Sequence, residues 1–90
     1  GTVSRIDPRT NQVVATIPVG VPESGGDIAT GAGRVWVRTT TVLLSAIDPA
    51  TNTVVERFGP PAGSGGVRVA GDTVWVTAHD IHTVWAMRSH

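Results

Sequence analysis

Short hydrophobic segments rich in Val, Ile, Thr and Trp alternate along this chain of 90 residues with clusters of Gly, Pro, Asn and Asp. β-Branched and aromatic residues fit the pleated surface of a strand, whereas the residues between the segments favour turns. No segment has convincing helical periodicity. The pattern therefore predicts an all-β fold, with strands at residues 3–6, 12–19, 27–30, 34–38, 42–47, 53–58, 67–70, 73–77 and 83–87.

The chain also repeats itself. The segment IDPRTNQVV at residues 6–14 returns as IDPATNTVV at residues 47–55, displaced by 41 residues. A second match, GRVWV at residues 33–37 and DTVWV at residues 72–76, is interleaved with the first and displaced by 39 residues. A period of roughly 40 to 45 residues is typical of a four-stranded propeller blade. Two motifs that recur in the same order define one structural unit.

We therefore expect a single β-propeller fragment over residues 1–90, made of two repeats that amount to about two four-stranded antiparallel blades. The blade boundaries are expected near residues 20–26 and 59–66. Counted from the inner strand of a blade outward, the predicted strands are the third and fourth of one blade, all four of the next, and the first three of the last. On this interpretation the chain starts and stops within a blade.

The repeated IDPxTN segment has the composition of a turn. Pro8 suits the first central position of a type I turn, the Asp7 carboxylate can accept a backbone N–H two residues on, and Asn11 tolerates the left-handed conformation. Asp48 and Asn52 repeat this solution 41 residues later. Turn chemistry explains these Asp and Asn residues, so we predict a structural role for them. The sequences around Gly31 and Gly71 are also expected to be tight turns.

The two VWV segments are apolar on both faces of the predicted strand, which is typical of a strand with a sheet packed on either side. Stacked blades provide such an environment. We therefore expect Trp36 and Trp75 to fill the space between blades, because large aromatic residues are most often core residues.

Composition and charge narrow the function classes. There is no Cys, so disulfides and thiolate metal sites are excluded, and seven Arg balance seven acidic residues to a formal charge of zero. A neutral chain lacks the basic field that nucleic acid or an anionic membrane would select, so we expect neither as a partner. No apolar run approaches the roughly 20 residues of a membrane helix, and the first residues lack the layout of a signal peptide.

Catalytic motifs are absent from the sequence. There is no Gly-x-Ser-x-Gly segment, and no predicted helix follows the GSGG segment at residues 63–66 to form a phosphate site. His79, Asp80 and His82 could supply nitrogen and oxygen ligands to a divalent metal, but the spacing is short and typical of an exposed loop. We therefore expect no metal site, no cofactor and no catalytic residue within this chain.

In a propeller the loops between strands 2 and 3 and the loops between blades lie on one face around the channel. Any ligand contact is expected on that face, which would carry Glu23, Ser24, Arg38, Thr39, Ser64, His79, Asp80 and His82.

The IDPxTNxVV segment, followed by a Gly-rich loop and GxVWV, resembles the bacterial propeller repeats of the YVTN type and of the streptogramin-lyase-like (virginiamycin B lyase-like) group. The resemblance covers nearly the whole chain and implies the propeller fold. It also favours an extracytoplasmic location, secreted or periplasmic. The lyase carries histidines and a glutamate with magnesium just after the Trp strand. Here the corresponding segments WVRT (36–39) and WVTA (75–78) hold no glutamate, so no catalytic residue is carried over.

The sequence therefore predicts a non-catalytic binding or scaffolding module. Two alternatives stay open: part of a streptogramin-lyase-like enzyme that further blades complete, and a purely structural, designed or excised repeat pair that assembles into a ring. The expected partners are further copies of the chain or further blades. In a closed assembly, an N-terminal strand at residues 12–19 of the next copy would complete the C-terminal strands at residues 67–70, 73–77 and 83–87. Three copies would form six blades and four copies eight.

Overall fold

The computed structural model describes residues 2–19, 26–39, 43–59, 65–78, 81 and 83–88. In these ranges the fold is all-β, and each of the nine predicted strands is present. Their ends lie within two residues of the prediction, which is the usual uncertainty of an element boundary. The strands are β1 (Thr2–Asp7), β2 (Gln12–Pro18), β3 (Asp27–Gly31), β4 (Arg34–Arg38), β5 (Leu44–Asp48), β6 (Thr53–Phe58), β7 (Val67–Ala70), β8 (Thr73–Ala78) and β9 (Thr83–Arg88).

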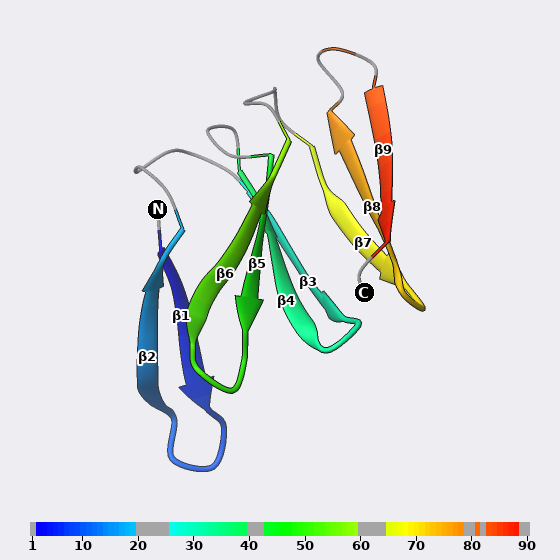
Figure 1. Cartoon of the computed structure of the whole chain (residues 1–90). Helices are drawn as coiled ribbons and strands as arrows, with labels where there is room; N and C mark the ends of the chain where they lie inside the picture. The colour runs from blue at the N-terminus through cyan, green and yellow to red at the C-terminus, as the bar shows by residue number, and fades with distance from the viewer. Residues whose placement is uncertain are drawn as a thin grey trace.

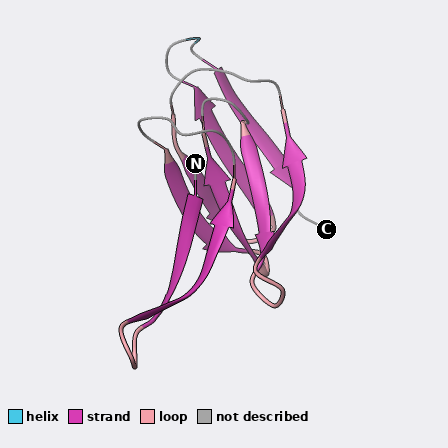
Figure 2. Cartoon of the chain, turned by 90° about the vertical axis from the view of Figure 1, so that its left-hand side faces the viewer, coloured by secondary structure: helices cyan, strands magenta, loops and turns pink. Residues whose placement is uncertain are grey.

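The strands form three small antiparallel sheets, which we call sheets A, B and C. Sheet A contains β1 and β2, sheet B contains β3, β4, β5 and β6 in that order, and sheet C contains β7, β8 and β9. The predicted division of the strands into groups of two, four and three is therefore confirmed. The described sheets form an open stack without a closed ring, with sheet B between sheets A and C (Figure 1). In the turned view the strands of the three sheets run roughly along one direction (Figure 2).

Two hydrophobic cores lie between the sheets because sheet B is apolar on both faces. The core between sheets B and C contains the buried residues Trp36, Leu43, Leu44, Ala46, Val67, Val74 and Val76. The core between sheets A and B contains Ile17, Val19, Val37 and Ile47. Side chains of successive strand residues point to opposite faces, so Trp36 and Val37 belong to different cores. Burial of these faces is the main favourable contribution to folding.

The two tryptophans differ in a way that the sequence did not predict. Trp36 is 2% exposed, as expected, whereas Trp75 is 46% exposed, so the prediction that Trp75 fills a packed layer is wrong for this chain. Trp36 lies on the face of sheet B that sheet C covers. Trp75 lies at the equivalent place in sheet C, but no fourth sheet among the described residues covers it. The same residue type is therefore core in one repeat and surface in the other.

The repeat is visible in the backbone as well. The Asp7 carboxylate accepts the N–H of Arg9 at 2.9 Å, and the Asp48 carboxylate accepts the N–H of Ala50 at 2.8 Å. Asn11 and Asn52 follow with φ of 56° and 57°, in the left-handed region. Each turn connects a pair of strands whose register shifts at the same place, between residues 5 and 6 and between residues 46 and 47. The predicted turn chemistry is thus confirmed in both copies.

The part of the chain that the structure describes contains no helix long and apolar enough to cross a membrane.

Candidate functional site

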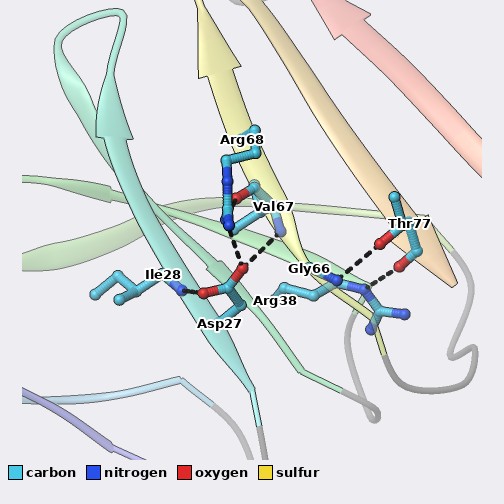
Figure 3. A network of polar contacts seen from close by, with 7 residues as sticks. All are labelled: Asp27, Ile28, Arg38, Gly66, Val67, Arg68 and Thr77. Atoms are coloured by element: carbon cyan, nitrogen blue, oxygen red, sulfur yellow. Dashed lines mark hydrogen bonds and ion pairs between the residues drawn. The ribbon is translucent and has the colours of Figure 1, made fainter.

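Polar side chains connect sheets B and C at one end of their interface. β3 begins at Asp27 and β4 ends at Arg38, and these two residues are opposite each other in the strand register. In sheet C, β7 begins at Val67, and Thr77 lies near the end of β8. Because β3 packs against β7, these residues come together at the same end of the stack (Figure 3).

Asp27 joins the two sheets through its carboxylate. Its Oδ2 accepts hydrogen bonds from the backbone N–H of Val67 and from Nη1 of Arg68, both at 3.0 Å. Its Oδ1 accepts the N–H of Ile28 at 2.9 Å. The Val67 N–H is the largest cause that holds the pKa of Asp27 below its ordinary value, while partial burial acts in the opposite direction. Asp27 is therefore ionised and weakly basic at neutral pH, which suits a structural role.

Arg38 crosses the same interface although it is only 1% exposed. Its Nε donates to the backbone carbonyl of Thr77 at 3.2 Å, and its Nη1 donates to the carbonyl of Thr39. A guanidinium does not lose its charge in a protein, so its burial requires such acceptors. Arg38 therefore helps to hold the end of β4 against β8.

The segment before β7 is fixed by the same residues of β8. The N–H of Gly66 donates to Oγ1 of Thr77 at 2.8 Å, and the N–H of Thr77 donates to the carbonyl of Gly66 at 3.0 Å. A Cβ at Gly65 would lie 1.8 Å from the Thr77 carbonyl oxygen, so only glycine fits there. This explains the Gly-rich composition next to β7 as a requirement of close backbone approach.

A hollow of about 520 Å³ lies at this end of the stack, between the free edge of β1 and sheet B. Arg38 and Thr39 contribute to its wall, together with Thr2 and Ser4 of β1. The rest of the lining is Val3, Val19, Gly26, Asp27, Ile28 and Val37. The wall therefore combines apolar and polar residues, and its two charged residues, Asp27 and Arg38, already have partners in the protein.

Two of the eight predicted ligand-face residues, Arg38 and Thr39, can be placed. Both are buried, and both line this hollow. The other six lie outside the described residues, as do most of the two predicted blade boundaries. These six are Glu23, Ser24, Ser64, His79, Asp80 and His82.

Sequence reasoning missed Asp27, Thr77 and Arg68 as members of this network. One signal for Asp27 was available, since it is an acidic residue at the first position of a strand that follows two glycines. Thr77 and Arg68 look like ordinary strand residues, and their role follows only from the packing of sheet C on sheet B.

Among the described residues, no group of three or more His, Cys, Asp or Glu side chains could hold a metal ion. Comparison with protein-family models, with curated proteins and with solved structures found no match for this chain. The resemblance to YVTN-type and streptogramin-lyase-like repeats therefore depends on the sequence motif alone.

Proposed function

We propose that this chain is a non-catalytic binding or scaffolding module of the β-propeller type, related to the YVTN-type and streptogramin-lyase-like repeats. The observation that carries the proposal is the stacking of the repeat units: sheet B has a sheet packed on both faces, and its hairpin β5–β6 has the same turn and the same register shift as β1–β2. Stacked antiparallel sheets built from one repeat are the arrangement of propeller blades.

The chemistry at the loop end supports a non-catalytic role. Asp27 accepts three hydrogen bonds from sheets B and C, and Arg38 donates to backbone carbonyls. A general base needs a pKa close to the working pH, whereas the pKa of Asp27 is displaced in the opposite direction. The charged groups that the structure describes at this end thus stabilise the stack.

The hollow beside Arg38 and Thr39 is the ligand site that we propose for this module. Because Asp27 and Arg38 already have partners, the ligand is expected to be uncharged, with hydrogen-bonding groups for the backbone of β1 at Thr2 and Ser4 and an apolar part for Val3 and Val37.

Amide chemical shifts of the isotopically labelled chain test this proposal. We would titrate glucose, N-acetylglucosamine and tri-alanine amide at neutral pH and follow the N–H signals of Gly26, Ile28 and Thr39. A bound ligand should shift these signals, and Val3→Phe should abolish the shifts by filling the hollow, because Val3 lines it and faces sheet B. Thr10→Leu, an exposed substitution in the turn at the other end of β1, is the control and should leave them intact. Shifts confined to the turn at residues 8–11 would contradict the proposed ligand face.

A further inference from the structure

Among the exposed hydrophobic surfaces of the described residues, two correspond to faces that pack together elsewhere in the stack. One is the outer face of sheet C, where Trp75 is 46% and Val84 is 61% exposed. The other is on the far side of sheet B, where Ile28 of β3 is 50% exposed. Tryptophan at half exposure on a sheet face is unusual for a soluble protein and marks a contact surface.

The chain itself shows how such a tryptophan packs. Trp36 of sheet B forms a core with Val67, Val74 and Val76 of sheet C, and its Nε1 donates to the carbonyl of Gly31 at 3.0 Å. Trp75 stands 39 residues after Trp36 and occupies the equivalent place in its strand, since both pair with an alanine of the next strand. The outer face of sheet C is therefore a second copy of the face that already packs on a neighbouring sheet.

The surface that would receive Trp75 is also present. Counting back 39 residues from Val67, Val74 and Val76 leads to Ile28, Val35 and Val37 on the side of sheet B that faces sheet A. Sheet A has two strands, which cover the β4 to β6 part of that face through Val3, Ile17 and Arg5, whereas Ile28 of β3 stays 50% exposed. An apolar cavity of about 300 Å³ lies there, against the free edge of β1. Its lining residues are Val3, Ser4, Arg5, Ile17, Ile28, Val35, Ile47, Pro49 and Asn52.

We propose that the outer face of sheet C of one copy, with Trp75 at its centre, packs into this groove beside Ile28 and Val35 of a second copy. The contact joins two different surfaces, so it is head-to-tail and can continue from copy to copy until the rotation closes a ring. This inference rests on the proposed stacking function and names its partner, a second copy of this chain.

The contact between copies differs from the internal one at its polar positions. Sheet C has Gly66 and Thr77 where sheet B has Asp27 and Arg38, 39 residues earlier, so the ionic and buried-arginine connections have no counterpart. Sheet C also has Ala70 in place of Gly31, where a Cβ would lie 2.6 Å from Val69. The two sheets therefore approach less closely, and the association depends on apolar surface with little dependence on salt.

One strand must leave its position for the two copies to pack together. β9 in sheet C and β1 in sheet A are the same strand of the repeat unit, so β9 of one copy and β1 of the other would occupy the same position at the contact. β9 directs Trp85 and Met87 toward the core between sheets B and C, whereas the equivalent residues of β1 are Ser4 and Ile6. We therefore expect β9 to keep its place and β2 of the neighbouring copy to pair with its free edge as the fourth strand.

Complementation between two variants tests the proposal. We would measure molar mass by light scattering for Trp75→Asp, Ile28→Asp and Val55→Asp, with circular dichroism to check folding. Val55 of β6 is 43% exposed although sheet B is covered on both faces, so its exposed side belongs to no contact between sheets. Trp75→Asp and Ile28→Asp should each weaken association about 30-fold or more, whereas Val55→Asp should leave it unchanged.

An equimolar mixture of Trp75→Asp and Ile28→Asp should recover a dimer, because each variant keeps the surface that the other lacks. A mixture that stays monomeric, or a native chain that is monomeric at high micromolar concentration, overturns the proposal. A symmetric dimer in which Trp75 of one copy packs on Trp75 of the other would also overturn the proposal. In that case Trp75→Asp would abolish association, and the mixture of the two variants would not recover it. The ligand hollow and this groove share Val3, Ser4 and Ile28, so the ligand titration is run on Trp75→Asp, which lacks the association but keeps the hollow, and it then reports on the proposed function separately.

Discussion

The carboxylate of Asp27, at the start of β3, accepts a hydrogen bond from the backbone N–H of Val67 at the start of β7, with 3.0 Å between Oδ2 and N. The two residues are 40 positions apart and belong to different sheets. Arg68 donates to the same oxygen. This side chain therefore fixes how sheet C is seated on sheet B, in addition to the apolar contact between their faces.

The first prediction concerns pH. The pKa of Asp27 in the folded chain is lowered from its ordinary value of 3.8, chiefly by the Val67 N–H. A group with a lowered folded pKa contributes stability that is present above the unfolded pKa and is lost as pH falls through the folded pKa. The difference in free energy of unfolding between the native chain and Asp27→Asn should thus be largest at neutral pH and shrink below pH 3.8.

Urea denaturation of both proteins at a series of pH values from neutral to acid measures this difference. The other carboxylates titrate in both proteins, so the comparison isolates Asp27. A difference that is the same at neutral pH and at pH 3 would show that the Asp27 charge does not contribute to stability.

The second prediction separates the two tryptophans. Trp36→Ala removes a side chain that is 2% exposed and should cost about 3 to 5 kcal/mol of unfolding free energy, as large aromatic truncations in cores do. Trp75→Ala should cost below about 1 kcal/mol in dilute solution, where no second copy covers the side chain. Melting temperatures measured at low micromolar concentration report both values. Equal losses in the two variants would show that Trp75 is buried in the monomer.

The strand positions followed from the sequence because they depend on local properties. Val-rich segments between Asp-Pro and Gly turns specify strands and hairpins directly, and the 41-residue repeat specified how strands group into sheets. The prediction that Trp75 is buried failed because burial there needs a further sheet on the outer face of sheet C, and the described residues form no such sheet. The same reason explains why Asp27 was missed, since its partner Val67 becomes a neighbour only when sheet C packs on sheet B.

The third prediction compares the same substitution at two equivalent positions of the repeat, Asn11 and Asn52. Asn11 and Asn52 both have left-handed backbone conformations, but Oδ1 of Asn52 also accepts a hydrogen bond from Arg5 at 2.8 Å, which connects sheet A to the turn of sheet B. Asn11→Ala should cost about 1 kcal/mol because an alanine adopts this conformation with strain. Asn52→Ala should cost about 1 kcal/mol more, from the lost hydrogen bond.

Asn52→Gly refines this test, because glycine removes the strain and keeps the loss of the Arg5 contact. Chemical denaturation of the three variants should rank Asn52→Ala as the least stable. Equal stability of Asn11→Ala and Asn52→Ala would mean that the hydrogen bond from Arg5 to Asn52 adds nothing to the one that Arg5 also donates to the Pro49 carbonyl.

The last prediction concerns Arg38. Arg38→Leu keeps the apolar part of a buried side chain but leaves the carbonyls of Thr77 and Thr39 without the donors Nε and Nη1. An unpaired buried acceptor costs about 1 to 3 kcal/mol, so this variant should unfold at a clearly lower urea concentration. Arg34→Leu is the matched control, because Arg34 lies in the same strand and makes an ion pair at 3.1 Å with the exposed Glu56. A surface pair of this kind contributes about 0 to 1 kcal/mol. If both leucine variants unfold at the same urea concentration, the connection from Arg38 to β8 does not stabilise the stack.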